Sequence, residues 1–174
     1  LGQSGALLYY EFGPSAPATL QPDSQAGALA VADVTANGGV PDSAAGYSAG
    51  SGGQSVSANG WNGSTNFWQL AITIQPGLTL QITGVYFATR SSATGPTNWS
   101  LAYSADGYGS SLAGGGLRTN ATFEAATATV ATVAATNTLS VRLYGSGAAS
   151  AAGTWRLDDL TVQGVIAVDP AANL

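Results

Sequence analysis

Short segments in which apolar and polar residues alternate recur along the sequence, and this period of two restricts the fold more than any other feature. Such alternation sends successive side chains to opposite faces of a β-strand. Residues 67–74 (FWQLAITI) and 139–144 (LSVRLY) show the pattern most clearly. Residues typical of turns separate the segments, as in β-sandwiches and barrels. We therefore expect an all-β protein made of one antiparallel β-sandwich domain.

The pattern predicts strands in nine places. They are residues 6–12, 28–35, 67–74, 78–89, 99–103, 117–123, 127–133, 139–144 and 154–162. Gly84 predicts a bulge within its strand, because glycine tolerates the local bend. Residues 41–53, rich in Gly, Ser and Ala, predict a loop. No segment predicts a helix; the alanine-rich residues 122–135 contain enough Thr and Val to favour strand.

The composition excludes several classes of chemistry. The 174 residues include no His, Cys, Lys or Met. Histidine-assisted nucleophiles, ordinary zinc sites and phosphate-binding P-loops all need residues that are missing here. Four Arg against nine acidic residues give a net charge of −5, which argues against nucleic acid as a partner. We expect a protein that is not an enzyme.

The sequence also bears on the compartment. Its start, LGQSGALLYY, has neither a basic region nor a long apolar region, so we expect any signal peptide to have been removed already. No apolar run approaches the ~20 residues that span a bilayer, and we expect no membrane span. The low charge and the abundance of Gly, Ala, Ser and Thr favour an extracellular or cell-surface location.

Two adjacent acids, Asp158 and Asp159, lie within the apolar segment TWRLDDLTV. Alternation sends them to opposite faces, so one should point inward, and a buried carboxylate needs a partner. That partner could be an arginine, such as Arg90 or Arg142, or a calcium ion. An ordinary surface acid or salt bridge is the alternative.

Residues 154–162 resemble the last strand of jelly-roll carbohydrate-binding modules, in which a tryptophan precedes a pair of acidic residues. The resemblance implies a jelly-roll-like sandwich. In several of these modules, a Glu near the first strand and an Asp of the last strand bind a structural calcium. Glu11, in YYEFGP, matches the first position. The resemblance therefore implies Ca²⁺ as a structural cofactor, with Glu11 and either Asp158 or Asp159 as ligands.

A second stretch, from Phe87 to Gly107, combines FATRSS with GPTNWSLAYSADG. It is similar to a run found in secreted bacterial β-sandwich domains, including surface proteins of the PEP-CTERM type. The resemblance covers about residues 60–163 and indicates a fold and a class without a specific activity. The printed residues end without the sorting tail of that class, so we expect either that the tail is cleaved or that the protein is exported by another route.

Aromatic residues offer a possible ligand contact. Trp61 lies in the loop sequence NGWNGS, where a sugar-stacking ring would be placed, whereas Trp68, Trp99 and Trp155 fall within strands and are expected in the core. A glycosidase would need Glu11 and Glu124 on either side of a cleft. The Ala and Thr around Glu124 do not predict such a cleft.

The two ends of the chain predict assembly. Residues 1–163 are expected to form the sandwich, with residues 1–12 as an exchangeable strand, and residues 164–174 a C-terminal extension that is either an edge strand or a donor strand. The apolar residues expected to join copies are Leu7, Leu8, Tyr9, Val165, Ile166 and Val168. Our main prediction is an extracellular structural subunit that assembles with copies of itself, through β-strand contacts, into a filament, sheath or surface layer. The alternative is a carbohydrate-binding module or adhesin domain with a polysaccharide partner.

Overall fold

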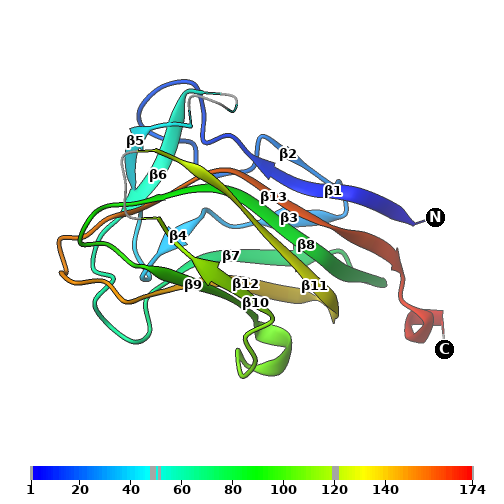
Figure 1. The fold of residues 1–174 in the computed structure, drawn as a ribbon. Coiled ribbons are helices and arrows are strands. Elements are labelled where there is room, and N and C mark those ends of the chain that lie inside the picture. Colours follow the sequence, from blue (N-terminus) through cyan, green and yellow to red (C-terminus); the bar gives the residue numbers. More distant parts are fainter. Residues whose placement is uncertain (1, 48–49, 51, 119–121, 174) are drawn as a thin grey trace.

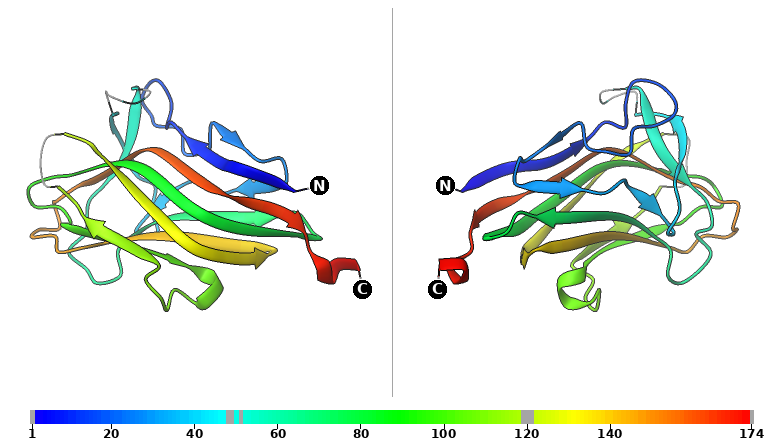
Figure 2. Two further views of the ribbon diagram at one scale, coloured as in Figure 1. Left: turned by 45° about the vertical axis from the view of Figure 1, so that its right-hand side comes forward. Right: turned by 180° about the vertical axis from the view of Figure 1, so that it is seen from behind.

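Two antiparallel β-sheets pack face to face in the computed structural model, which describes residues 2–47, 50, 52–118 and 122–173 (Figures 1 and 2). Within those residues, one sheet has seven strands in the order β11-β8-β13-β1-β2, with β6 also paired to β13 and β5 to β6. The other has six strands in the order β10-β9-β12-β7-β3, with β4 also paired to β7. The expected jelly-roll-like β-sandwich is confirmed.

The strands of the seven-stranded sheet are β1 (Gln3–Tyr10), β2 (Ser24–Gln25), β5 (Asp42–Ala45), β6 (Gln54–Ala58), β8 (Leu78–Ser91), β11 (Glu124–Thr136) and β13 (Trp155–Val168). Those of the six-stranded sheet are β3 (Leu29–Val31), β4 (Thr35–Ala36), β7 (Phe67–Ile74), β9 (Asn98–Tyr103), β10 (Ala113–Gly116) and β12 (Thr138–Ser146). The helices described are two short 3-10 turns, η1 (Ser104–Asp106) and η2 (Pro170–Asn173). Neither has the length and apolar character that crossing a bilayer requires.

The core lies between the sheets and follows directly from the alternation. Along β12, Leu139, Val141 and Leu143 are buried, while the residues between them are at least partly exposed. Burying each such side chain contributes roughly 1.5–3 kcal/mol, so a strand of this pattern is held with its apolar side inward. The outward-facing residues of the same strand remain available for other roles.

The strand predictions succeeded where alternation was strong. The predicted strand 67–74 coincides with β7, and β8 contains a register shift beside Gly84, as expected for a bulge. Four short strands, β2, β5, β6 and β10, were missed because their Ser, Gln, Gly and Ala residues carry little apolar signal. The predicted loop 41–53 is wrong at residues 42–45, which form β5. The predicted strand 117–123 is wrong at residues 117, 118, 122 and 123, which connect β10 of one sheet to β11 of the other. Residues 119–121 lie outside the described part.

The two ends of the chain pair with each other inside one molecule. Gln3 of β1 lies opposite Ile166 of β13, and β8 pairs with the other side of β13. Residues 164–168 are therefore part of a central strand, and the expected extension or edge strand beginning at residue 164 is corrected. The apolar VIAV segment already has its partners, and Figure 1 shows both termini at the same end.

The residues expected to join copies are mostly occupied within the molecule. Leu7, Leu8 and Ile166 are buried, and the Tyr9 hydroxyl donates a hydrogen bond to Asp159. Val165 lies within the paired part of β13, and Val168 is about half exposed at its end. An exchange of strands between copies would have to replace these internal contacts.

Candidate functional site

The outer face of the six-stranded sheet presents a row of polar and aromatic side chains. Register places Phe67 of β7 opposite Tyr144 of β12, and Gln69 opposite Arg142. The residues that alternate with them on β7, Trp68 and Leu70, are buried in the core. Because alternate residues share a face, these four side chains all lie on the outer face, where each is half-buried.

Arg142 is held between two aromatic rings. Its guanidinium carbon lies 3.9 Å from the ring centroid of Phe67 and 3.8 Å from that of Tyr108. Its Nε–H donates to the Gln69 side-chain carbonyl at 2.8 Å, and its Nη1 donates to the Tyr144 hydroxyl at 3.2 Å. We call this group of five residues the Arg142 cluster.

A tight turn brings Tyr108 into the cluster. After η1, Gly107 adopts a left-handed backbone and Tyr108 follows with φ of 62°, an uncommon value for a residue other than glycine. The Tyr108 backbone N–H donates to the Tyr103 carbonyl at 3.0 Å, which anchors the turn to the end of β9. The turn thereby holds the Tyr108 ring over the guanidinium.

Two open hollows flank the cluster on the same sheet. One, of about 300 Å³, is lined by Tyr108 and Tyr144 and by the serines Ser64, Ser100, Ser111 and Ser146. The other, of about 380 Å³, lies over β3, β7 and β12 and is lined mainly by small residues such as Ala71 and Ser140. Hydroxyl groups and aromatic rings that converge on an open hollow can bind a polar ligand with apolar faces.

The second candidate region surrounds the paired acids, on the other sheet. Asp158 is fully buried, whereas Asp159 is half-buried and has a positive φ of 44°. The register between β13 and β8 shifts between Asp158 and Thr161, so a bulge displaces the two acids from regular pairing. The prediction that one acid points inward is borne out by this burial.

Two backbone N–H groups stabilise the Asp158 carboxylate. Its Oδ2 accepts from the Tyr47 N–H at 2.5 Å, and its Oδ1 accepts from the Asp159 N–H at 2.9 Å. Burial raises the pKa of Asp158 to about 6, an effect that these two hydrogen bonds oppose and that the negative charges of Asp159 and Glu11 reinforce. Arg142, one of the suggested partners, belongs instead to the opposite sheet.

The three acids that the resemblance implies as calcium ligands lie in one region, since Asp159 and Glu11 both act electrostatically on Asp158. Glu11 is near enough to Asp158 to raise its pKa, but among the described residues no three acidic side chains gather closely enough to hold a metal ion. Calcium prefers six to eight oxygen ligands. Calcium binding by Glu11, Asp158 and Asp159 therefore stays a prediction.

Trp61, the predicted ligand contact, is a core residue. It is fully buried, its ring centroid lies 5.5 Å from Trp68 and 4.8 Å from Trp155, and its Nε1–H donates to the Ala58 carbonyl at 2.7 Å. The loop folds inward because Gly145, which has no side chain, leaves space for the indole. No ring face is left for a sugar, and the prediction is corrected. Trp61, Trp68 and Trp155 together form the tryptophan cluster.

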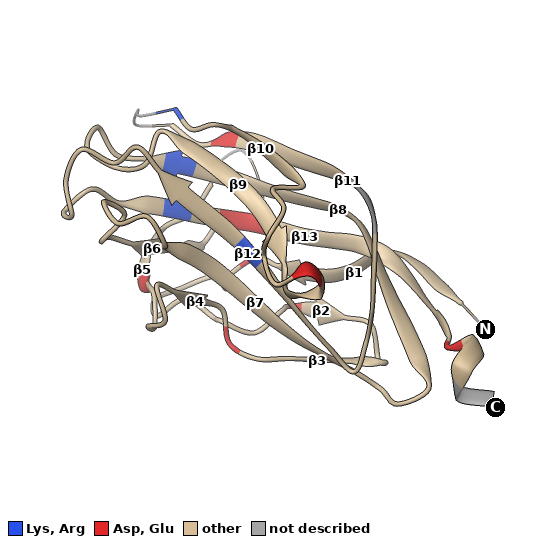
Figure 3. Ribbon diagram, turned by 90° about the horizontal axis from the view of Figure 1, so that it is seen from below, with Lys and Arg blue, Asp and Glu red and all other residues tan. Residues whose placement is uncertain are grey.

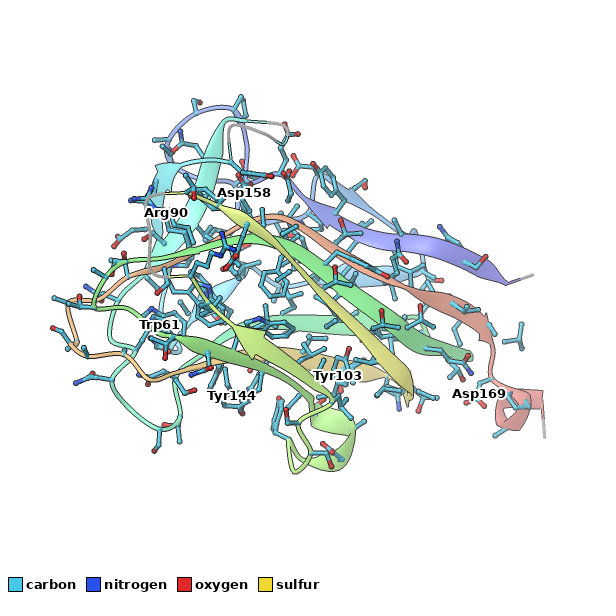
Figure 4. All side chains as sticks on the ribbon, viewed as in Figure 1. Trp61, Arg90, Tyr103, Tyr144, Asp158 and Asp169 are labelled. Carbon is cyan, nitrogen blue, oxygen red and sulfur yellow. The ribbon has the colours of Figure 1, made fainter. Side chains whose placement is uncertain are left out.

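The Arg142 cluster was not predicted as a site, although a signal for it existed. The alternation within 67–74 and 139–144 already placed Phe67 with Gln69, and Arg142 with Tyr144, on one face of each strand. Only the pairing of β7 with β12 brings the two pairs together, and only the turn after η1 adds Tyr108. Figure 4 shows Tyr144 far from Asp158 and Arg90, which lie toward the other sheet.

Comparison with known proteins identifies the class of fold. No protein-family model and no curated protein matches the sequence. Among solved structures, the CBM22-1 xylan-binding domain of Xyn10C from Paenibacillus barcinonensis has a TM-score of 0.56 at 15% identity, over 92% of this chain and 95% of that one. The N-terminal CBM22-1-CBM22-2 tandem domain of the same protein has a TM-score of 0.52 at 16% identity, over 96% of this chain and 47% of that one.

A weaker likeness is found to the K3 cleaved adhesin domain of Lys-gingipain from Porphyromonas gingivalis, with a TM-score of 0.47 at 13% identity over 92% and 99% of the two chains. At such low identities, the likeness to the Xyn10C domains establishes a shared fold. The chain therefore has the β-sandwich fold of these carbohydrate-binding modules.

Proposed function

We propose that the protein is a non-catalytic carbohydrate-binding domain whose ligand lies across the Arg142 cluster. The observation that carries the proposal is the set of half-buried Phe67, Tyr108 and Tyr144 rings around one arginine on an open sheet face. Aromatic rings offer apolar surfaces to sugar rings, while the serines of the adjoining hollow offer hydroxyl groups to hydrogen-bond with the ligand.

The fold supports the same proposal. The Xyn10C domain with a TM-score of 0.56 is described as xylan-binding, and its likeness covers nearly the whole of both chains. Together with the absence of His, Cys and Lys from the sequence, this favours binding without catalysis. A polysaccharide ligand in turn favours the expected extracellular or cell-surface location. These observations favour carbohydrate binding over a filament subunit.

Affinity electrophoresis through gels containing soluble polysaccharides, xylan among them, tests the proposal, and titration calorimetry measures the affinities. Tyr108→Ala removes one ring without disturbing the core, and we expect it to weaken binding by about 5- to 30-fold, the equivalent of about 1–2 kcal/mol. Tyr86→Ala is the matched control, because Tyr86 is a half-buried tyrosine on β8 of the opposite sheet. Retardation by no polysaccharide, or equal losses in both variants, would overturn the proposal.

The filament prediction is tested separately by light scattering coupled to size-exclusion chromatography. If carbohydrate binding is the function, the purified protein elutes as a monomer at micromolar concentration. Concentration-dependent polymers that disappear when residues 2–12 are deleted would instead support assembly by exchange of β1.

A further inference from the structure

Arg142 is a cation with no ion pair in the part of the chain that the structure describes. Among the described residues, the ion pair found joins Arg118 to Glu124 at 3.3 Å, and no carboxylate lies within ion-pair distance of Arg142. The acid on the neighbouring turn, Asp106, instead accepts a hydrogen bond from the Ser110 N–H at 3.0 Å. Charged residues are also sparse over this sheet (Figure 3). Arg142 is therefore a half-buried cation with no ion-pair partner among the described residues, in a protein whose net charge is −5.

The guanidinium is also fixed in position. Aromatic rings cover both of its flat faces, and two neutral oxygens, from Gln69 and Tyr144, accept from Nε and Nη1. A guanidinium has five N–H donors, and the two hydrogen bonds use two of them. The rest point from the edge of the group, which the rings leave uncovered. Little side-chain entropy remains to be lost when a ligand binds to this edge.

A rigid guanidinium edge favours a planar anion. Two parallel N–H donors match the two oxygens of a carboxylate, and such charge-assisted pairs are roughly twice as strong as neutral hydrogen bonds. The hollow beside Tyr108 and Tyr144, lined by serine hydroxyls, provides space for the rest of a sugar residue. We propose that Arg142 selects acidic polysaccharides by pairing with the carboxylate of a uronic acid residue. This inference rests on the proposed carbohydrate-binding function.

The test compares one polymer in two chemical forms. A glucuronic-acid-bearing xylan is used as isolated, and also after chemical reduction of its carboxyl groups to alcohols, which removes the charge and keeps the chain. We expect the unmodified protein to bind the acidic form at least about tenfold more tightly at low salt. Added salt should reduce the difference, because ion pairs at a partly exposed site are screened.

Substitutions test whether Arg142 causes the preference for the acidic form of the polymer. Arg142→Gln should bind the two forms with equal affinity, because it removes the cation that distinguishes them. Arg142→Lys keeps the charge but loses the planar fork, and should retain only part of the preference. Arg118→Gln is the matched control: it makes the same charge change at a site with a 75% exposed side chain, and should leave the preference intact.

The outcomes separate this inference from the proposed function. Equal affinity of the unmodified protein for the two forms, or a preference that survives in Arg142→Gln, overturns the inference. If binding is nonetheless weakened by Tyr108→Ala, the carbohydrate-binding function stands without acid selectivity. A preference for sulfated polymers over carboxylated ones would also overturn the assignment to uronic acid. Failure to bind either form or any other polysaccharide overturns the proposed function itself.

Discussion

The tryptophan cluster and the Arg142 cluster lie on opposite faces of the same two strands. On β7, Trp68 points into the core and its neighbour Phe67 points outward; on β12, Gly145 faces the tryptophans and Tyr144 faces outward. Both clusters are rich in aromatic rings, yet the inner one is closed on every side. The face of the strand, more than the size of the aromatic side chain, therefore decides whether a ring stabilises the fold or is available to a ligand.

The largest effect on stability is expected in the buried tryptophan cluster. Trp61→Ala should lower the free energy of unfolding by about 3–5 kcal/mol, because it removes a fully buried indole and leaves a cavity between Trp68 and Trp155. Urea denaturation followed by fluorescence measures the change. Tyr108→Ala, on the outer face, should cost under about 1 kcal/mol. Similar losses in the two variants would contradict the distinction between the clusters.

The contrast between a buried and an accessible group also applies to charged residues: Asp158 is buried, whereas Arg142 is half-buried. The pKa of Asp158 is raised from 3.8 to about 6, so the folded protein holds this proton where the unfolded chain has lost it. The contribution of Asp158 to the free energy of unfolding should therefore fall as the pH rises from about 4 to about 6, by up to about 3 kcal/mol. Asp158→Asn should abolish this component in denaturation curves measured across the range.

Calcium bears on the same buried charge. The sequence resemblance implies either Asp158 or Asp159 as a Ca²⁺ ligand, and if Asp158 binds the cation, the cation offsets the cost of the buried charge. We expect added Ca²⁺ to raise the unfolding midpoint at pH 7 and a chelator to lower it, with little response in Asp158→Asn. An unmodified protein that responds to neither would refute the calcium prediction and leave the pH dependence standing.

An intermediate effect on stability is expected from a substitution at Gly145. A Cβ at this position would lie 2.8 Å from the Trp61 ring and 3.0 Å from the Trp155 ring, closer than carbon atoms normally approach. Gly145→Ala should therefore destabilise the protein by about 1–3 kcal/mol through overpacking. Gly115→Ala on β10 is a less crowded control, with a nearest contact of 3.1 Å to one edge of Trp99. Thermal denaturation that ranks the two variants equally would show that the core can adjust around Trp61.

The smallest expected effect is a gain in stability, at Tyr103. The Tyr103 hydroxyl is buried and has no hydrogen-bond partner among the described residues, and burial raises its pKa. Tyr103→Phe should stabilise the protein by about 1 kcal/mol, because it removes an unsatisfied polar group. Tyr144→Phe removes a hydroxyl that accepts from Arg142 on the outer face, and should leave stability within about 0.5 kcal/mol. A loss of stability in Tyr103→Phe would indicate a partner for this hydroxyl, such as an ordered water.

Local patterns in the sequence were sufficient to predict the class of fold and most of the long strands. Alternation in residues 67–74 and 139–144 predicted β7 and β12 because burial of apolar side chains has the same period as the strand. It also predicted that one of Asp158 and Asp159 would be buried. These features are local, and each depends on residues that are neighbours in the chain.

Contacts between residues far apart in the chain depend on how the strands pack in three dimensions. Trp61 has the sequence surroundings of an exposed loop, but space beside Gly145, 84 positions further along the chain, draws it into the core. Residues 164–168 have no partner nearby in the sequence, yet β1 provides one from the other end of the chain. The Arg142 cluster likewise depends on the register between β7 and β12 and on the turn that positions Tyr108. Long-range packing selects these contacts, and a local pattern of residues does not encode them.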